Sequence, residues 1–170
     1  MAVRDKILDV AEYWVSPGEY RPTEDDLISF FTESGAEAAP TLEEAREALT
    51  RLSNGVRVQG QIKHLCGIFA CYVLRQAGVD VRWTLLGGNM VGDGVTKLLG
   101  YQNIVPGDVA IINRASHHFI VSDIDYASNT LLSVDGNTAN QYIRLVSKKI
   151  HYDGSDANTK SVVAFYRVKT

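Results

Sequence analysis

Residues 65–78 read LCGIFACYVLRQAG, and this stretch decides the fold that we expect. Steps of three and four residues from Cys66 reach only apolar side chains, which are Phe69, Ala70, Val73, Leu74 and Ala77. That spacing predicts a helix over 66–77 with one apolar stripe, closed by Gly78. Cys66 lies at the N-terminal end of the stripe, whereas Cys71 falls off it. We expect the stripe to face the rest of the protein.

The chain before this segment is also predicted to be helical. Apolar residues at near-helical spacing predict a first helix over 3–15. Two further helix starts carry a hydroxyl residue followed three positions later by an acidic one, Thr23 with Asp26 and Thr41 with Glu44. The helix from Thr41 is expected to end at residues 53–55. None of these helices can bury its apolar face alone, so we expect them to cover a sheet.

The second half of the chain reads as strands. Pro106-Gly107 fits a type II turn, with Pro at the second and Gly at the third position. Strands are predicted over 108–113, 117–125, 130–135, 142–147 and 161–168. Short loops between them favour antiparallel pairing. Helices followed by strands indicate an α+β fold with an antiparallel β-sheet.

Length and composition indicate how many domains the chain has and which partners it is not expected to bind. The chain has 170 residues, which suits a single domain (1–170) with a helical part over 1–55 and a core over 56–170. Its formal net charge is −3 and it has no Lys/Arg stripe, so no nucleic acid is expected as a partner. It lacks the apolar core of a signal peptide and any run of about 18 apolar residues. We therefore expect synthesis in the cytoplasm without a signal peptide, and no membrane span.

Cys66 is the candidate nucleophile because it begins the predicted helix. Unpaired N–H groups at a helix start stabilise a thiolate and can lower a cysteine pKa from about 8.5 into the range of about 3.5–7.5. The same groups can donate to a developing oxyanion. Gly67 removes a side chain where a substrate or the sheet must approach closely. Cys71 is interpreted as a small buried hydrophobic residue. The two cysteines point in different directions around the predicted helix, so no disulfide is expected between them.

Residues 66–79 resemble the nucleophile helix of NlpC/P60 peptidases. In that family a cysteine and small residues precede an apolar run and Tyr-Val…Arg-Gln-Ala-Gly, and Gly67 stands where the family usually has Ser. Residues 106–109 (PGDV) and 117–121 (HHFIV) resemble the family's next element, in which a Pro-Gly-Asp turn leads to a strand that opens with the catalytic histidine. The resemblance covers residues 59–140 and implies a papain-like fold of the NlpC/P60 or CHAP type.

Two adjacent histidines compete for the role of the base. On a strand His117 and His118 point to opposite faces, and alternation does not separate them because both sides are mostly apolar. Residues 134–137 (VDGN) resemble the Glu-x-Asn that ends the next strand in CHAP amidases, at a distance that fits His118 better. The resemblance thus implies His118 as the base, with His117 as the alternative. Asp135 or Asn137 would accept a hydrogen bond from its second nitrogen and fix the tautomer.

Other groups near the predicted nucleophile carry weaker signals. Gln61 could supply an oxyanion donor, as a glutamine upstream of the nucleophile does in papain, although Gln59 competes for that role. Cys66, Cys71 and His64 lack the spacing of a zinc ligand set, so no metal and no other cofactor is expected. The glycines of residues 87–94 lack the Lys of a phosphate-binding loop and are interpreted as a flexible loop bordering the cleft.

The resemblance implies a cysteine hydrolase that forms an acyl-enzyme. NlpC/P60 and CHAP relatives cut peptide or amide bonds in bacterial cell-wall peptidoglycan, so peptidoglycan peptides are the expected substrate. A compact amidase without a signal peptide resembles the peptidoglycan amidase effectors of type VI secretion, or a phage lysin. An effector would act in the periplasm or cell wall after specialised secretion, and its producer would need a cognate immunity protein.

Two other functions remain open from the sequence. The papain-like fold also hosts deamidases, acyltransferases and proteases that act on proteins, and their sites would look the same. The third possibility is a catalytically inactive binding domain on the same scaffold.

Overall fold

The computed structural model of the chain describes residues 1–16, 19–36, 64–84, 87–112, 117–139, 142–155 and 161–170. The helix expected from Thr41 lies outside these residues. In the described part, the structure is α+β, as predicted. No helix there is both long and apolar enough to cross a membrane.

Three helices are described, namely α1 (Val3–Val15), α2 (Glu24–Glu33) and α4 (Leu65–Gln76). The prediction of α1 over 3–15 is confirmed. The predicted cap of α2 is also confirmed, because the Thr23 hydroxyl accepts a hydrogen bond from the Asp26 N–H and the Asp26 carboxylate accepts one from the Thr23 N–H. This reciprocal capping box satisfies N–H groups that the first turn of a helix leaves open.

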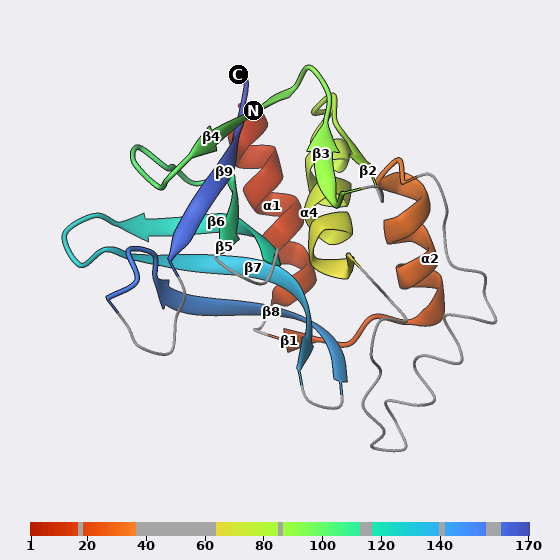
Figure 1. The fold of residues 1–170 in the computed structure, drawn as a ribbon. Coiled ribbons are helices and arrows are strands. Elements are labelled where there is room, and N and C mark those ends of the chain that lie inside the picture. The colour runs from red at the N-terminus through yellow and green to blue at the C-terminus, as the bar shows by residue number, and fades with distance from the viewer. Residues whose placement is uncertain (17–18, 37–63, 85–86, 113–116, 140–141, 156–160) are drawn as a thin grey trace.

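A seven-stranded antiparallel sheet follows the order β1-β8-β7-β6-β5-β9-β4, and β2 and β3 form a separate hairpin. The strands are β1 (Glu19–Tyr20), β2 (Arg82–Thr84), β3 (Asn89–Val91), β4 (Val95–Leu99), β5 (Val109–Ile112), β6 (His117–Asp125), β7 (Thr130–Ala139), β8 (Tyr142–His151) and β9 (Val162–Val168). Figure 1 shows α1 and α4 side by side against one face of the sheet, with α2 beyond α4.

The central helix α4 is buried around almost its whole circumference, not only along the predicted stripe. It contacts β6 and β7 of the sheet, and also α1, α2 and the β2–β3 hairpin. Side chains off the stripe, such as Ile68 and Cys71, are therefore as buried as Phe69 on it. The single-stripe prediction was too narrow because several elements enclose this helix.

The sheet is buried on both faces. Alternate residues of β6 enter different clusters, since Ile120 joins the core under the helices and Phe119 and Val121 join a second core on the opposite face. The second core is completed by residues such as Leu131, Tyr152 and Phe165. Burial on both faces explains why the sequence of β6 does not alternate cleanly between apolar and polar residues.

Two sheet regions differ from the sequence prediction. Strand β7 is longer than expected, because residues 135–137 (DGN) continue the ladder to Ala139↔Tyr142 instead of turning, and β8 extends beyond residue 147 to pair with the start of β7. Gly136 permits this continuation beside the helix, since a Cβ there would lie 3.1 Å from the Cβ of Phe69. The glycine-rich stretch predicted as a loop (87–94) contains β3, and β4 follows it directly. Gly92, between them, has φ +149° and passes so close to Val81 that a side chain would not fit.

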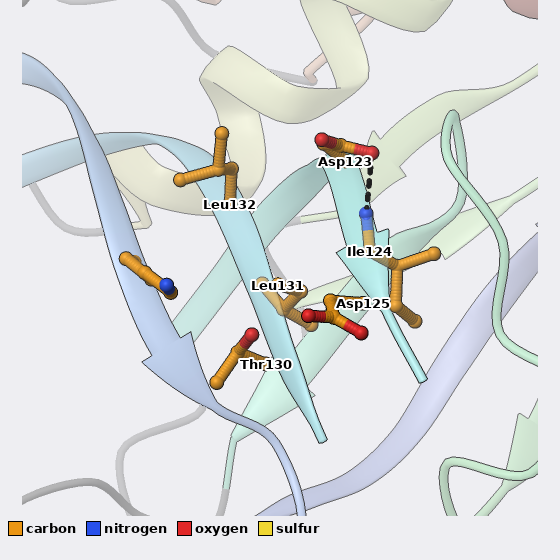
Figure 2. Close-up of a pocket in the computed structure, with 7 residues that line it drawn as sticks. Asp123, Ile124, Asp125, Thr130, Leu131 and Leu132 are labelled. Carbon is orange, nitrogen blue, oxygen red and sulfur yellow. Dashed lines mark hydrogen bonds between the residues drawn. The ribbon is translucent and has the colours of Figure 1, made fainter. Parts of the chain in front are cut away.

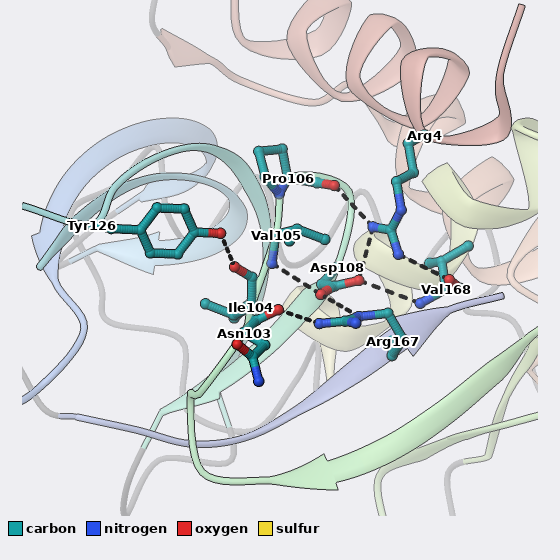
Figure 3. A network of polar contacts seen from close by, with 9 residues as sticks. All are labelled: Arg4, Asn103, Ile104, Val105, Pro106, Asp108, Tyr126, Arg167 and Val168. Atoms are coloured by element: carbon teal, nitrogen blue, oxygen red, sulfur yellow. Dashed lines mark hydrogen bonds and ion pairs between the residues drawn. The ribbon is translucent and has the colours of Figure 1, made fainter. Parts of the chain in front are cut away.

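The Pro-Gly-Asp turn joins both ends of the chain to the sheet. The type II turn is confirmed, because Gly107 has a φ of +90° and the Asp108 N–H donates to the Val105 carbonyl at 3.1 Å. The Asp108 carboxylate is fully buried and accepts from Arg4 of α1 and Arg167 of β9, each at 2.9 Å (Figure 3). Arg4 also donates to the Val168 carbonyl, which holds the two termini side by side.

We expect Asp108→Asn to lower the free energy of unfolding by about 3 kcal/mol, because two guanidinium groups would lose the carboxylate that neutralises them. The side chains of Arg4 and Arg167 are 22% and 30% exposed, so water offsets part of the cost. Urea denaturation followed by circular dichroism measures the change. Asp9→Asn, an exposed carboxylate on the same helix as Arg4, is the control; an equal loss in both variants would contradict the role of Asp108.

Candidate active site

Cys66 is the second residue of α4 and is half-buried. The residue before the helix, His64, has φ 64° and ψ 13°, a left-handed conformation that costs a non-glycine residue about 1 kcal/mol. The His64 carbonyl accepts the first helical hydrogen bond, from the Ile68 N–H at 2.8 Å. Cys66 therefore lies in the first turn, where backbone N–H groups point out of the helix and favour negative charge.

Gly67 makes room for a tryptophan. A Cβ on Gly67 would lie 2.0 Å from the Cη2 atom of Trp83, which is fully buried. The close approach expected at Gly67 is thus made by a side chain of the β2–β3 hairpin, not by the main sheet. Trp83 also contacts His64, with ring centroids 5.8 Å apart, so one indole packs against both Gly67 and the residue that precedes the helix.

His117, the first residue of β6, forms an ion pair with Asp135 of β7. The distance from His117 Nε2 to Asp135 Oδ2 is 2.8 Å, and the two side chains are 20% and 3% exposed. The sequence favoured His118 for this contact and held His117 as the alternative. The structure corrects that preference, because the carboxylate lies against His117.

His118 is held on the other face of β6, among aromatic rings under the helices. It is 2% exposed, its ring lies 5.1 Å from that of Trp83 in an edge arrangement, and it stacks on Tyr166 at 6.1 Å. The neighbouring Ile120 enters the same helix-side core. The pleat of the strand therefore separates the two imidazoles, and periodicity could not show which of them meets the carboxylate.

The two histidines act on Cys66 together. Burial by itself raises the pKa of the Cys66 thiol, but hydrogen bonds from the side chains of His117 and His118, the charge on His117 and the His118 N–H lower it to about 5. Burial likewise lowers the pKa of His117, yet its hydrogen bonds to Asp135 and Cys66 and their negative charges raise it to about 9. At neutral pH the pair is thus a thiolate and an imidazolium.

Asp135 has two further neighbours that the sequence analysis missed. Ser133 Oγ lies 3.5 Å from Asp135 Oδ1, and Lys148 Nζ of β8 lies 3.9 Å from Asp135 Oδ2. Ser133 could have been found from the two-residue repeat of a strand, which puts it on the same face as Asp135. Lys148 and Trp83 could not, because their positions depend on the register of β8 and on the β2–β3 hairpin.

Two predicted site residues cannot be placed among these contacts. Asn137 lies on β7 opposite Arg144, but its side chain is outside the described residues. Gln61, with its competitor Gln59, lies outside the described residues altogether.

Cys71 behaves as the sequence analysis expected of a small buried residue. It is fully buried, and its Sγ donates to the Ser34 carbonyl at 3.3 Å. Burial raises the pKa of its thiol to about 12 despite the nearby charge of Arg75. The two cysteines thus differ sharply in thiolate character.

Two cavities are described among the residues that the structure places, and Cys66 lines neither of them. One, of about 170 Å³, is lined by both strands of the β6–β7 hairpin, including Asp123 and Leu131 (Figure 2). Asp123 is six residues along β6 from His117, or about 20 Å at the rise of a strand. A second, of about 450 Å³, lies between β3 and β4 beside Tyr166. Within the described residues, no group of three or more His, Cys, Asp or Glu side chains could hold a metal ion.

Comparisons of the chain with models of protein families, with curated proteins and with solved structures found no match. The site is therefore interpreted from its own residues.

Gly67→Ala should lower the free energy of unfolding by about 2 kcal/mol or more, because the new methyl group would overlap the Trp83 ring. Helix propensity alone predicts the opposite sign, since Ala is favoured over Gly by about 1 kcal/mol. Urea denaturation of Gly67→Ala, Trp83→Leu and the double variant measures the coupling. In the double variant the alanine should cost less than in the native chain; strictly additive losses would contradict the overlap.

Alkylation by iodoacetamide at pH 6 should be about tenfold faster at Cys66 than at a free model thiol. The lowered pKa makes Cys66 mostly thiolate at this pH, while a thiol with a pKa of 9 is about one part in a thousand ionised. An acidic thiolate is also a weaker nucleophile, and this reduces the expected ratio of the two alkylation rates by roughly 60-fold. The rate should rise through a midpoint near pH 5, as measured by mass spectrometry of intact protein.

The matched control for this measurement is Cys66→Ser, which leaves Cys71 as the remaining thiol and should stay unmodified. His117→Ala should move the midpoint of Cys66 alkylation to higher pH, because the thiolate loses its cation. A midpoint near that of a model thiol in the native chain would contradict the ion pair.

Proposed function

We propose that the chain is a cysteine hydrolase of peptide or amide bonds, with Cys66 as nucleophile, His117 as acid and base, and Asp135 as the group that orients His117. The observation that carries this proposal is the contiguous set of Cys66, His117 and Asp135, in which a half-buried thiol meets an imidazole that is itself paired with a buried carboxylate. Nucleophile, base and orienting group in this order are the requirement for activated thiol chemistry.

The contacts of His117 assign its two nitrogens. Nε2 faces Asp135, which leaves Nδ1 for Cys66. The Cys66 thiolate attacks the carbonyl carbon of the scissile amide, and the carbonyl electrons move onto oxygen. N–H groups of the first turn of α4 are placed to stabilise that oxyanion. Nδ1 then gives its proton to the leaving nitrogen, the C–N bond breaks and a thioester remains on Cys66.

Hydrolysis of the thioester runs through the same atoms in reverse. His117, now neutral, takes a proton from water at Nδ1, and the hydroxide attacks the thioester carbon. Collapse of the second tetrahedral intermediate breaks the C–S bond and releases the acid. The thiolate and the imidazolium are restored, and Asp135 keeps the ring in the same orientation throughout both steps.

We also propose a papain-like arrangement for this fold. A helix with the cysteine in its first turn packs against an antiparallel sheet, and the third strand after the β2–β3 hairpin, β6, opens with the histidine. The third residue follows on the neighbouring strand β7. This order of elements supports the NlpC/P60 or CHAP type that the sequence motifs resemble.

Peptidoglycan peptides are the proposed substrate. The support for this choice is the resemblance of residues 66–79 and 106–121 to peptidases that act on the cell wall. On the same basis we propose action in the periplasm or cell wall after specialised secretion, with a cognate immunity protein in the producing cell.

Incubation with purified sacculi and defined muropeptides tests the proposal. Mass spectrometry should show cleavage of an amide bond by the native chain and by Cys71→Ala, the matched cysteine control, but none by Cys66→Ala. His117→Ala should lower the rate by about 10²–10⁴-fold, the usual contribution of an acid–base group. His118→Ala should lose less, because it leaves the pair of His117 and Asp135 intact.

Other outcomes of this experiment discriminate the remaining functions. Rapid alkylation of Cys66 without cleavage of any wall preparation would favour an enzyme that acts on proteins, namely a deamidase, acyltransferase or protease. An unreactive Cys66 would favour a binding domain. A greater loss in His118→Ala than in His117→Ala would reverse the assignment of the base.

A further inference from the structure

One oxygen of Asp135 is shared by two cations. His117 Nε2 lies 2.8 Å from Oδ2 on one side, and Lys148 Nζ lies 3.9 Å from the same atom on the other. The side chain of Lys148 is 40% exposed, whereas that of Asp135 is 3% exposed. The ammonium therefore reaches from the solvent side of β8 to a carboxylate that is otherwise enclosed by protein.

The hairpin of β7 and β8 fixes this approach. Lys148 is paired with Ser133 in the ladder, and Ser133 Oγ lies 3.3 Å from the Lys148 carbonyl and 3.5 Å from Asp135 Oδ1. The hydroxyl thus links the backbone at Lys148 to the second oxygen of the carboxylate. With one oxygen beside Ser133 and the other beside both cations, Asp135 is held in one orientation.

We propose that Lys148 is a positioning residue that binds the same Asp135 oxygen as His117 and thereby limits how strongly this carboxylate stabilises the His117 imidazolium.

The electrostatic reason is that an ammonium beside the carboxylate offsets part of its field at the imidazole. Without Lys148, a carboxylate with almost no contact with water would face His117 alone, and attraction between charges is strong where water is excluded. Among the described residues, the other titratable groups that face this cluster are Cys66 on α4 and His118 on β6, and Lys148 approaches from β8. The charges of the cluster then alternate in sign from Cys66 through His117 and Asp135 to Lys148.

The consequence for catalysis rests on the function proposed above. An imidazolium that is bound too tightly by its carboxylate is a poor acid, and His117 must give its proton to the leaving nitrogen. A cation that weakens this attraction makes His117 a better acid at neutral pH. Lys148 would thus adjust the proton transfer without touching the substrate.

The test is an NMR titration of the His117 imidazole in the full chain carrying Cys66→Ala, so that neither the thiolate nor any hydrolysis contributes. The His117 signal is assigned by its loss in His117→Gln. Lys148→Met should raise the titration midpoint of His117 by about half a pH unit, a modest shift because Lys148 is partly exposed to solvent. Lys148→Arg, which keeps the charge, should restore a midpoint close to that of the parent.

Lys149→Met is the matched control, because it removes the same charge from the next residue of β8. Lys149 lines the cavity near Asp125, on the distant part of the β6–β7 hairpin, and should leave the His117 midpoint unchanged. Lys148→Gln provides a second neutral variant, and circular dichroism checks that each variant is folded. Equal shifts for Lys148→Met and Lys149→Met, or a fall of the midpoint in Lys148→Met, would overturn the proposal whether or not the chain proves to be a hydrolase.

Discussion

The enclosure of α4 is the constraint on which the rest of the structure depends. A helix buried on nearly every side needs close neighbours on several sides, and glycines supply the room at its N-terminal turn. Gly67 admits the Trp83 ring, and Gly136 of β7 lies where a Cβ would be 3.2 Å from the Leu65 carbonyl oxygen. Cys66 is placed between these two contacts. The position of Cys66 is thus set by packing on both sides of a single helical turn.

The same enclosure determines the electrostatics of the site. Burial opposes a charge on both Cys66 and His117, so each charge persists only because an opposite charge lies in contact with it. The partly exposed Lys148 and His117 connect the cluster to solvent, while Asp135 in the middle does not. The charges lie where little water screens them, which strengthens the attraction between them. Helix α4 and strands of the sheet, rather than loops, fix their positions.

Much of the fold follows from local pattern in the sequence. The helix over 3–15, the cap at Thr23 and the strand over 117–125 were predicted correctly, because each depends on spacing or capping within a short segment. The extension of β7 through Gly136 was not, since Asp-Gly-Asn is a good turn sequence unless a helix packs against it. The strands near Gly92 were missed for a related reason, because the glycines there serve close backbone contacts.

In the site, too, short sequence patterns predict some residues, whereas other contacts depend on how distant segments pair. The sequence could indicate that a histidine at the start of β6 would meet Cys66 and that Asp135 would follow on the next strand. It could not assign the base, because both histidines contact the thiol and only the position of Asp135 distinguishes them. Lys148 reaches the site through the ladder between β7 and β8, which no local pattern encodes.

Exposure gives a further physical reason for assigning the two imidazoles to different tasks. An acid that serves a leaving nitrogen and then a water molecule must be reachable by both, and His117 is 20% exposed at its side chain. His118 is 2% exposed and lies between the rings of Trp83 and Tyr166, where a proton exchanged with water would have to cross packed aromatic side chains. Its fixed position suits a group that contacts the sulfur and holds it in place. In the proposed mechanism proton transfer then belongs to His117, and the pleat of one strand separates it from His118.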